Sequence, residues 1–127
     1  MKVNNVDASV ITNFLFGLCY QLLDGEVSLD NEPDLTQMMT DSVELLEYTV
    51  EEIMEKRASL MLVYYPSKFD FYWFMARLVN LLKRRNDDLI DPLPEIKQRM
   101  EALMKGTSTQ HILKEAKKSE EKGIYWV

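Results

Sequence analysis

Acidic side chains recur along one predicted helix of this chain, and carboxylate chemistry is therefore the first possibility to consider. Four of them follow one another at three- and four-residue spacing and share a helical face: Glu44, Glu47, Glu51 and Glu55. A carboxylate-bridged dimetal site needs such residues inside a bundle, usually with a Glu-x-x-His motif, and the sequence contains no such motif. The glutamates also lie opposite the apolar stripe of their helix. We therefore predict a solvated acidic face and no metal site.

The single cysteine and the single histidine are the other residues with reactive side chains. Cys19 lies in an apolar segment, which predicts a small core residue. His111 lies among threonine, serine and glutamine in a weakly apolar segment, which predicts a surface histidine without the partners that a triad or a zinc site requires. No glycine-rich phosphate loop occurs. The sequence thus predicts no catalytic residue, no cofactor and a non-enzymatic protein.

Aromatic residues are concentrated in one stretch, YYPSKFDFYWF at 64–74, which holds seven of the 13 in the chain. At helical spacing, most of these rings fall on two adjacent apolar stripes and predict core packing. Trp73, Arg77 and Arg84 fall on the remaining side, and tyrosine, tryptophan and arginine dominate interface hot spots. A second apolar stretch ends the chain as IYWV. The predicted partner-binding residues are Tyr64, Tyr65, Trp73, Arg77, Arg84, Tyr125 and Trp126.

Charge is unevenly distributed along the chain. The net charge is −6, but residues 1–63 carry 12 acidic and three basic side chains, a net of −9, whereas residues 64–127 carry nine acidic and 12 basic ones, a net of +3. An acidic chain disfavours nonspecific nucleic-acid binding, which depends on neutralising phosphates. The simplest interpretation is two solvated helical faces. The division also permits head-to-tail self-association or an acidic face for a basic partner.

Composition favours one globular domain in a reducing, cytoplasmic compartment. A length of 127 residues is typical of a single domain, and a hydrophobic fraction of 46 % with 28 % charged residues fits a folded core. One cysteine permits no intramolecular disulfide and suits a reducing interior. The longest apolar tract, 69–82, is interrupted by Asp70 and Arg77, so no membrane span is predicted. The N-terminus lacks the pattern of a signal peptide.

The hydrophobic period is helical throughout and predicts five helices. Asp7 is the expected N-cap of the first, and Gly25 its left-handed C-terminal cap. Ser67 is the expected N-cap of the third, with Asp70 completing a partial capping box. The predicted ranges are about 7–24, 33–64 with a possible break near 58–59, 68–86, 94–105 and 107–122.

Apolar side chains on these helices predict how they pack. The first helix has a broad apolar surface that includes Phe14 and Tyr20. Gly106 is expected to end the fourth helix and to separate it from the fifth. The second helix carries a regular stripe: Leu35, Met39, Val43, Leu46, Val50, Ile53 and Leu60.

These observations predict an all-α protein, a compact bundle of about five helices, with a fragment of an α-solenoid of helical hairpins as the alternative. Residues 1–127 are expected to form one domain, with 107–127 as a peripheral helix and an apolar tail. The predicted function is an adaptor or scaffold that docks another protein, or a second copy, through an aromatic and arginine helix face. The alternative is a helical binder of an apolar small molecule or lipid.

Overall fold

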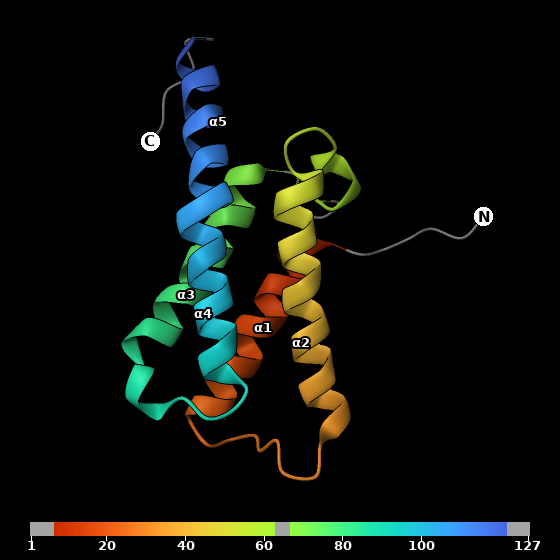
Figure 1. Ribbon diagram of the computed structural model, residues 1–127, viewed down its shortest axis with the longest axis vertical. Coiled ribbons are helices and arrows are strands. Elements are labelled where there is room, and N and C mark those ends of the chain that lie inside the picture. The colour runs from red at the N-terminus through yellow and green to blue at the C-terminus, as the bar shows by residue number, and fades with distance from the viewer. Residues whose placement is uncertain (1–6, 63–66, 122–127) are drawn as a thin grey trace, which may run out of the picture.

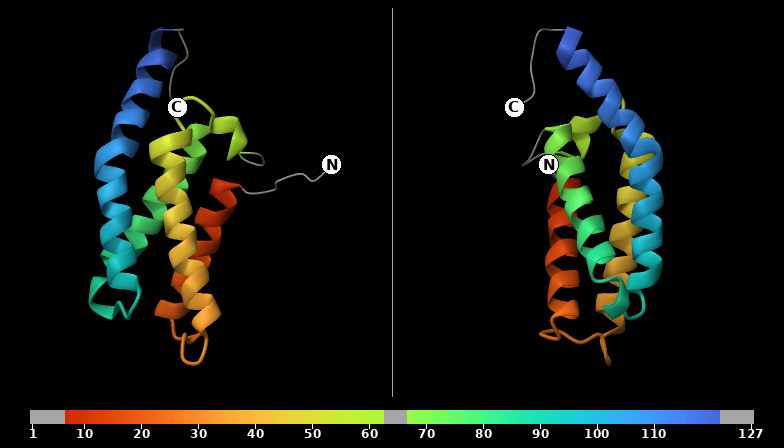
Figure 2. Two further views of the ribbon diagram at one scale, coloured as in Figure 1. Left: turned by 45° about the vertical axis from the view of Figure 1, so that its right-hand side comes forward. Right: turned by 90° about the vertical axis from the view of Figure 1, so that its left-hand side faces the viewer.

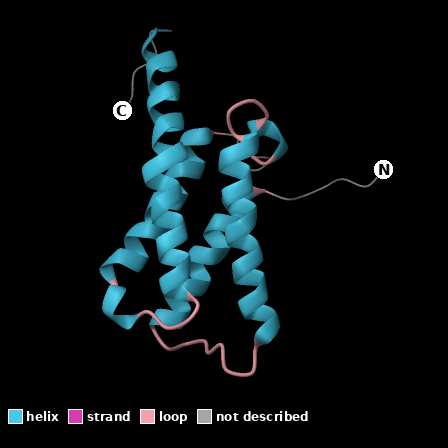
Figure 3. Cartoon of the chain, in the orientation of Figure 1, coloured by secondary structure: helices cyan, strands magenta, loops and turns pink. Residues whose placement is uncertain are grey.

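The computed structural model of this chain describes residues 7–62 and 67–121. Within these ranges every regular element is helical and no strand occurs, which confirms the predicted all-α class. Figure 1 labels the α-helical segments, and Figure 3 shows the loops that join them. Their bounds are α1 Ala8–Leu23, α2 Pro33–Tyr48, α3 Lys68–Arg84, α4 Leu93–Leu103 and α5 Thr109–Glu121.

The fourth and fifth predicted helices are joined into one rod. A π-helical segment, Met104–Ser108, links α4 to α5, so the described residues form four helical rods and not five separate helices. The prediction that Gly106 lies just beyond the end of the fourth helix is confirmed, because α4 ends at Leu103, but α5 follows directly and no loop separates the two helices. Because glycine lacks a Cβ atom, Gly106 adopts the non-helical angles φ −92° and ψ −109°, which bend the rod without ending it. The Thr109 hydroxyl donates a hydrogen bond to the carbonyl of Met104 across this bend.

The rods form two hairpins that lie side by side. α1 packs against α2 and α3, and α4 packs against the same two helices, so the order around the bundle is α1, α2, α4, α3. α1 and α3 run parallel, while α2 and α4 run parallel to each other in the opposite direction (Figures 1 and 2). The connection from α2 to α3 therefore runs diagonally across the end of the bundle, between opposite corners. The compact helical fold is confirmed, and this parallel pairing of successive hairpins is also the arrangement that α-solenoids repeat.

The core draws side chains from every rod. On α3, Phe71, Met75 and Leu78 are completely buried, which confirms the first apolar stripe predicted for this helix. Each buried ring removes about 150–250 Å² from water, so α3 supplies a large share of the hydrophobic stabilisation. The helices are amphipathic, and within the described ranges none combines the length with the hydrophobicity that crossing a bilayer requires.

The apolar stripe of the second helix is buried as far as residue 53. α2 continues as the π-helical segment Thr49–Ile53, and a turn and the 3₁₀ segment Ala58–Leu60 follow. Leu60 is 56 % exposed, so its predicted place in the stripe is wrong. The reason is geometric: once the helix ends, the 3.6-residue period no longer determines which side chains face the core. Met39, Val43, Leu46 and Val50 are completely buried, and Ile53 nearly so.

Short-range capping fixes where the rods begin. The Asp7 carboxylate accepts hydrogen bonds from the backbone N–H groups of Ser9 at 2.8 Å and of Val10 at 3.1 Å, as predicted for an N-cap. The Ser67 hydroxyl accepts from the N–H of Asp70 at 3.4 Å and caps α3. Gly25 has a positive φ of 74°, which confirms its role at the end of α1.

Candidate interaction surface

Five side chains meet on the outer side of the seam between α1 and α3. Phe16 and Tyr20 lie one helical turn apart on α1, and Trp73, Phe74 and Arg77 lie on the neighbouring α3. Ring–ring and cation–π contacts join these five residues into one group, which we name the aromatic–arginine cluster. Because α1 and α3 run parallel and form the most extensive helix pair of the described residues, residues about 60 positions apart in sequence come together here.

Arg77 is the centre of the cluster. Its guanidinium carbon lies 4.1 Å from the centroid of the Phe16 ring. It also lies 5.3 Å from the Trp73 centroid and 5.6 Å from the Phe74 centroid, within the range of cation–π attraction. The rings contact one another as well, with centroids 6.3 Å apart for Phe16 and Tyr20 and 5.4 Å apart for Trp73 and Phe74. Three aromatic side chains therefore flank one positive charge, and Tyr20 joins the group through Phe16.

A hydrogen bond fixes the orientation of the guanidinium. Arg77 donates through Nη2 to Oδ1 of Asn13 on α1 at 2.8 Å. Its Nε is buried and has no hydrogen-bond acceptor within the described part of the chain. The side chain is thus held between two helices while one of its donors remains unused. An arginine held in this way loses little conformational freedom on binding.

The cluster is accessible from solvent. Trp73 is 59 % exposed and Tyr20 is 50 % exposed. Phe14, one turn before Leu18 on α1, is exposed as well. Phe14 and Tyr20 belong to the broad apolar surface predicted for the first helix, but the core does not cover them, because α1 makes its substantial contacts with α2 and α3.

The structure brings together some of the predicted partner-binding residues. Trp73 and Arg77 both belong to the cluster. Arg84 lies two turns further along α3, exposed and without an ion pair to another described residue. Four predicted residues lie outside the described residues: Tyr64, Tyr65, Tyr125 and Trp126.

Sequence reasoning missed the contribution of α1. Phe16 and Tyr20 are spaced four residues apart, which indicates that they share a face. That spacing does not say which helix lies beside the face, because the pairing of α1 with α3 depends on packing across the whole chain. Phe74 was expected in an apolar stripe, and it does pack at the edge of α3, where Trp73 and Arg77 contact it.

The single cysteine is a core residue, as predicted. Cys19 is completely buried on α1. Burial raises the pKa of its thiol to about 12, because an apolar environment disfavours the thiolate. The thiolate is the reactive form of cysteine, so the folded protein presents an inert thiol.

His111 is half-buried, so the prediction of a surface histidine is confirmed only in part: the ring also packs against Tyr72 of α3. Its Nδ1 and the Tyr72 hydroxyl lie 2.6 Å apart and share a hydrogen bond, which the hydroxyl donates when the ring is protonated at Nε2. The contact arises because Tyr72 is buried on α3 and its hydroxyl needs a partner. Burial lowers the pKa of His111 and raises the pKa of Tyr72. The charged groups around the ring are Glu55, Lys68, Lys114 and Glu115.

The glutamates of the acidic helix divide into paired and unpaired groups. Glu47 forms an ion pair with Arg99 of α4, and Glu55 forms one with Lys114 of α5. Glu44 and Glu51 are exposed, as the predicted solvated face requires. Among residues 7–62 and 67–121, no three histidine, cysteine or acidic side chains converge as metal ligands would.

No family model matches this chain, and neither the curated proteins nor the solved structures include a significantly similar one.

Proposed function

We propose that this chain is a non-enzymatic helical adaptor that docks another protein through the aromatic–arginine cluster. We place it in a reducing, cytoplasmic compartment, which suits a chain whose one cysteine is a buried thiol. The observation that carries the proposal is the exposed Trp73 beside an oriented arginine, with the exposed Tyr20 joined to the same cluster through Phe16. Large rings left exposed together need a reason, since monomers seldom expose extended apolar patches.

The cluster offers a partner both apolar and polar contacts. Trp73 and Tyr20 present ring faces on which an apolar side chain or a helix of the partner would pack. Arg77 presents a charge whose orientation is already fixed by Asn13 at 2.8 Å. Arg84 extends the positive charge along α3. Tryptophan, tyrosine and arginine are enriched at hot spots, the two aromatic side chains because they bury large areas with few rotatable bonds, and arginine because it adds charged hydrogen bonds to its contact area.

The proposal is tested by capture of partners and measurement of their affinity. The full chain and its Trp73→Ala/Tyr20→Ala variant are immobilised, and proteins retained from a cell extract are identified and then purified for titration. We expect the double variant to bind the purified partner about 30-fold more weakly, which corresponds to about 2 kcal/mol. Both rings are half exposed, so the thermal melt should stay within a few degrees of the original chain.

A matched control separates the cluster from exposed aromatic residues in general. Tyr48 is an equally exposed ring on α2, and Tyr48→Ala should leave this affinity unchanged. Equal affinity of the original chain and the cluster variant would refute the proposal. So would an equal loss of affinity in the Tyr48→Ala variant, because the partner would then not bind specifically at the aromatic–arginine cluster.

The alternative function, binding of an apolar small molecule or lipid, stays a prediction. Two grooves of about 330 and 340 Å³ border α4, but charged side chains line both. Native mass spectrometry of the purified chain would detect a molecule that co-purifies. No specific feature of the described residues favours this alternative over protein docking.

A further inference from the structure

The outer face of α2 is acidic and carries two exposed apolar side chains. Met38 is 51 % exposed and Tyr48 is 52 % exposed, in spite of their size. Three- and four-residue spacing places carboxylates on the same side of this helix and its π-helical continuation. None of these carboxylates forms an ion pair within residues 7–62 and 67–121. We name this set the acidic α2 face: Met38, Asp41, Glu44, Tyr48 and Glu52.

A groove of opposite charge lies between α3 and the α4–α5 rod. Its volume is about 330 Å³. Apolar side chains form its floor, and lysines stand at its rim. Lys83 forms no ion pair in the described part of the chain, whereas Lys105 lies 3.7 Å from Glu101. We name it the lysine-rimmed groove, lined by Ala76, Val79, Asn80, Lys83, Glu101, Met104, Lys105 and Thr109.

The groove keeps a positive balance in spite of its one carboxylate. Lys97 lies 3.2 Å from Glu101, so three lysines surround a single glutamate. The pKa of Glu101 is lowered chiefly by the hydrogen bond from Lys97, and further by the charges of Lys105 and Lys83. The charged side chains that line the groove are Lys83, Lys105 and Glu101, an excess of one positive charge, and Lys97 pairs with Glu101 from outside the lining. The groove is therefore suited to an acidic surface with apolar side chains.

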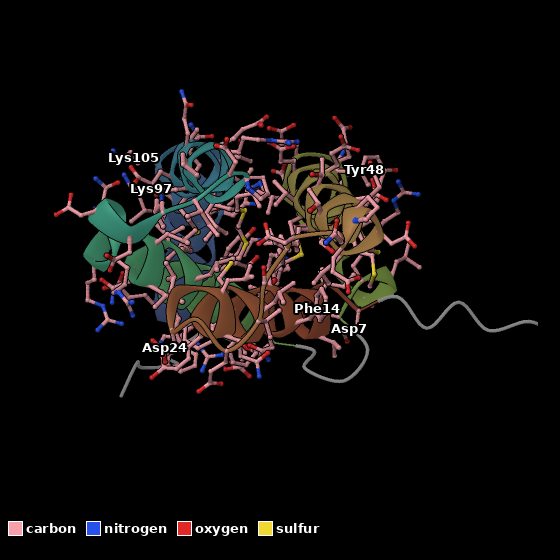
Figure 4. All side chains as sticks on the ribbon, turned by 90° about the horizontal axis from the view of Figure 1, so that it is seen from below. Asp7, Phe14, Asp24, Tyr48, Lys97 and Lys105 are labelled. Atoms are coloured by element: carbon pink, nitrogen blue, oxygen red, sulfur yellow. The ribbon has the colours of Figure 1, made fainter. Side chains whose placement is uncertain are left out.

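The two surfaces lie on opposite flanks of the molecule. α2 and α3 occupy diagonal corners of the bundle, since each packs mainly against α1 and α4. In Figure 4, seen from below, Lys97 and Lys105 lie on one flank and Tyr48 lies on the other. One molecule cannot bring its own acidic face to its own groove. A second copy can seat its acidic face on the groove of the first, and its own groove then stays free for a third copy.

We propose that copies of this chain associate head to tail, with the acidic α2 face of one seated on the lysine-rimmed groove of the next. Tyr48 or Met38 supplies the side chain that packs on Val79 and Met104, and the flanking carboxylates meet Lys83 and Lys105. The two surfaces differ, so the contact is heterologous and builds an open chain or a closed ring. The inference goes beyond the proposed function, because it uses neither Trp73 nor Arg77.

Charge reversal on each surface tests the proposal. One variant carries Asp41→Lys, Glu44→Lys and Glu52→Lys, and the other carries Lys83→Glu and Lys105→Glu. The mean mass is measured by light scattering and sedimentation over a range of concentrations. We expect the original chain to gain mass with concentration in low salt and to lose it when salt rises from ~0.01 to ~1 M, which shortens the Debye length from about 30 to about 3 Å.

Mixing the variants gives the decisive result. Each variant alone faces like charge with like charge and should associate about tenfold more weakly or not at all. An equimolar mixture pairs a basic α2 face with an acidic groove, and should recover association. Circular dichroism checks that both variants keep their helix content.

Three outcomes would overturn the proposal. The original chain would remain monomeric in low salt at every concentration. Association would persist in both reversal variants. The third is loss of association in the Trp73→Ala variant, which would mean that the copies meet through the aromatic–arginine cluster. Partner docking depends on Trp73, whereas self-association does not. Failure of one proposal therefore leaves the other standing.

Discussion

Replacing Arg77 with alanine tests the central contact of the aromatic–arginine cluster. The change removes three cation–π contacts, of which the 4.1 Å contact with Phe16 is the closest, and one hydrogen bond to Asn13. A partly exposed cation–π contact contributes about 0.5–1 kcal/mol, and the two longer contacts add less. The charged hydrogen bond adds about 1.5 kcal/mol or more, offset by relief of the unpartnered Nε. We expect Arg77→Ala to lower the free energy of unfolding by about 1–3 kcal/mol.

Equilibrium urea unfolding measures this difference, and further variants interpret it. Arg77→Lys keeps the charge but loses the planar stack on the rings, so it should recover less than half of the loss. Combining Arg77→Ala with Phe16→Leu in a double-mutant cycle should give a coupling energy of about 0.5–1 kcal/mol. Arg84→Ala is the matched control on the same helix, and as an exposed substitution it should stay within about 0.5 kcal/mol of the original chain.

Two results would refute the reasoning. If Arg77→Ala and Arg84→Ala had equal effects, the contacts around Arg77 would contribute nothing to stability. A coupling energy of zero with Phe16→Leu would mean that the ring and the guanidinium are neighbours without attraction. Either result would also weaken the case that the cluster is preorganised for a partner.

Three further predictions follow from local features. Asp7→Ala removes two backbone hydrogen bonds at the start of α1 and should cost about 0.5–2 kcal/mol in urea unfolding, whereas Asp7→Ser should recover most of it. Cys19 should resist a thiol reagent in the folded protein and react on unfolding, because burial holds its pKa at about 12; rapid reaction without urea would contradict this. Burial lowers the native pKa of His111 below its ordinary value of 6.5, so the unfolded chain binds a proton that the native state does not. The stability this contributes should be complete above pH 6.5 and decline as pH falls through the native pKa, and His111→Gln should remove that decline from melts recorded between pH 7.5 and about 5.

Features set by a few neighbouring residues could be predicted from the sequence. The caps at Asp7, Ser67 and Gly25 depend on hydrogen bonds and dihedral angles within a turn, and all three predictions are confirmed. The buried stripes of α2 and α3 follow from the 3.6-residue period for as long as the helix continues. The prediction for Leu60 was wrong because the apolar spacing continues in the sequence beyond the residue at which the helix ends.

Features set by long-range packing could not be predicted. Gly106 correctly marks the end of α4, but the sequence does not show that α5 follows across a bend with no intervening loop. The aromatic–arginine cluster was half predicted: Trp73 and Arg77 were identified, whereas Phe16 and Tyr20 join them only because α1 lies beside α3. The contact of His111 with Tyr72 could not be predicted for the same reason, since the two residues are 39 positions apart in sequence.

The diagonal connection between α2 and α3 has a consequence for how the chain folds during synthesis. α1 ends at residue 23, but its most extensive partner, α3, is complete only at residue 84, about 60 residues later. At a translation rate of ~5–20 residues per second, α1 waits roughly 3–12 s with the apolar side chains that α3 later covers exposed to the cell. A bundle in which each helix pairs only with its neighbour in sequence has a much shorter wait and a lower contact order. We therefore expect the nascent hairpin of α1 and α2 to be the stage at which this protein depends most on chaperones.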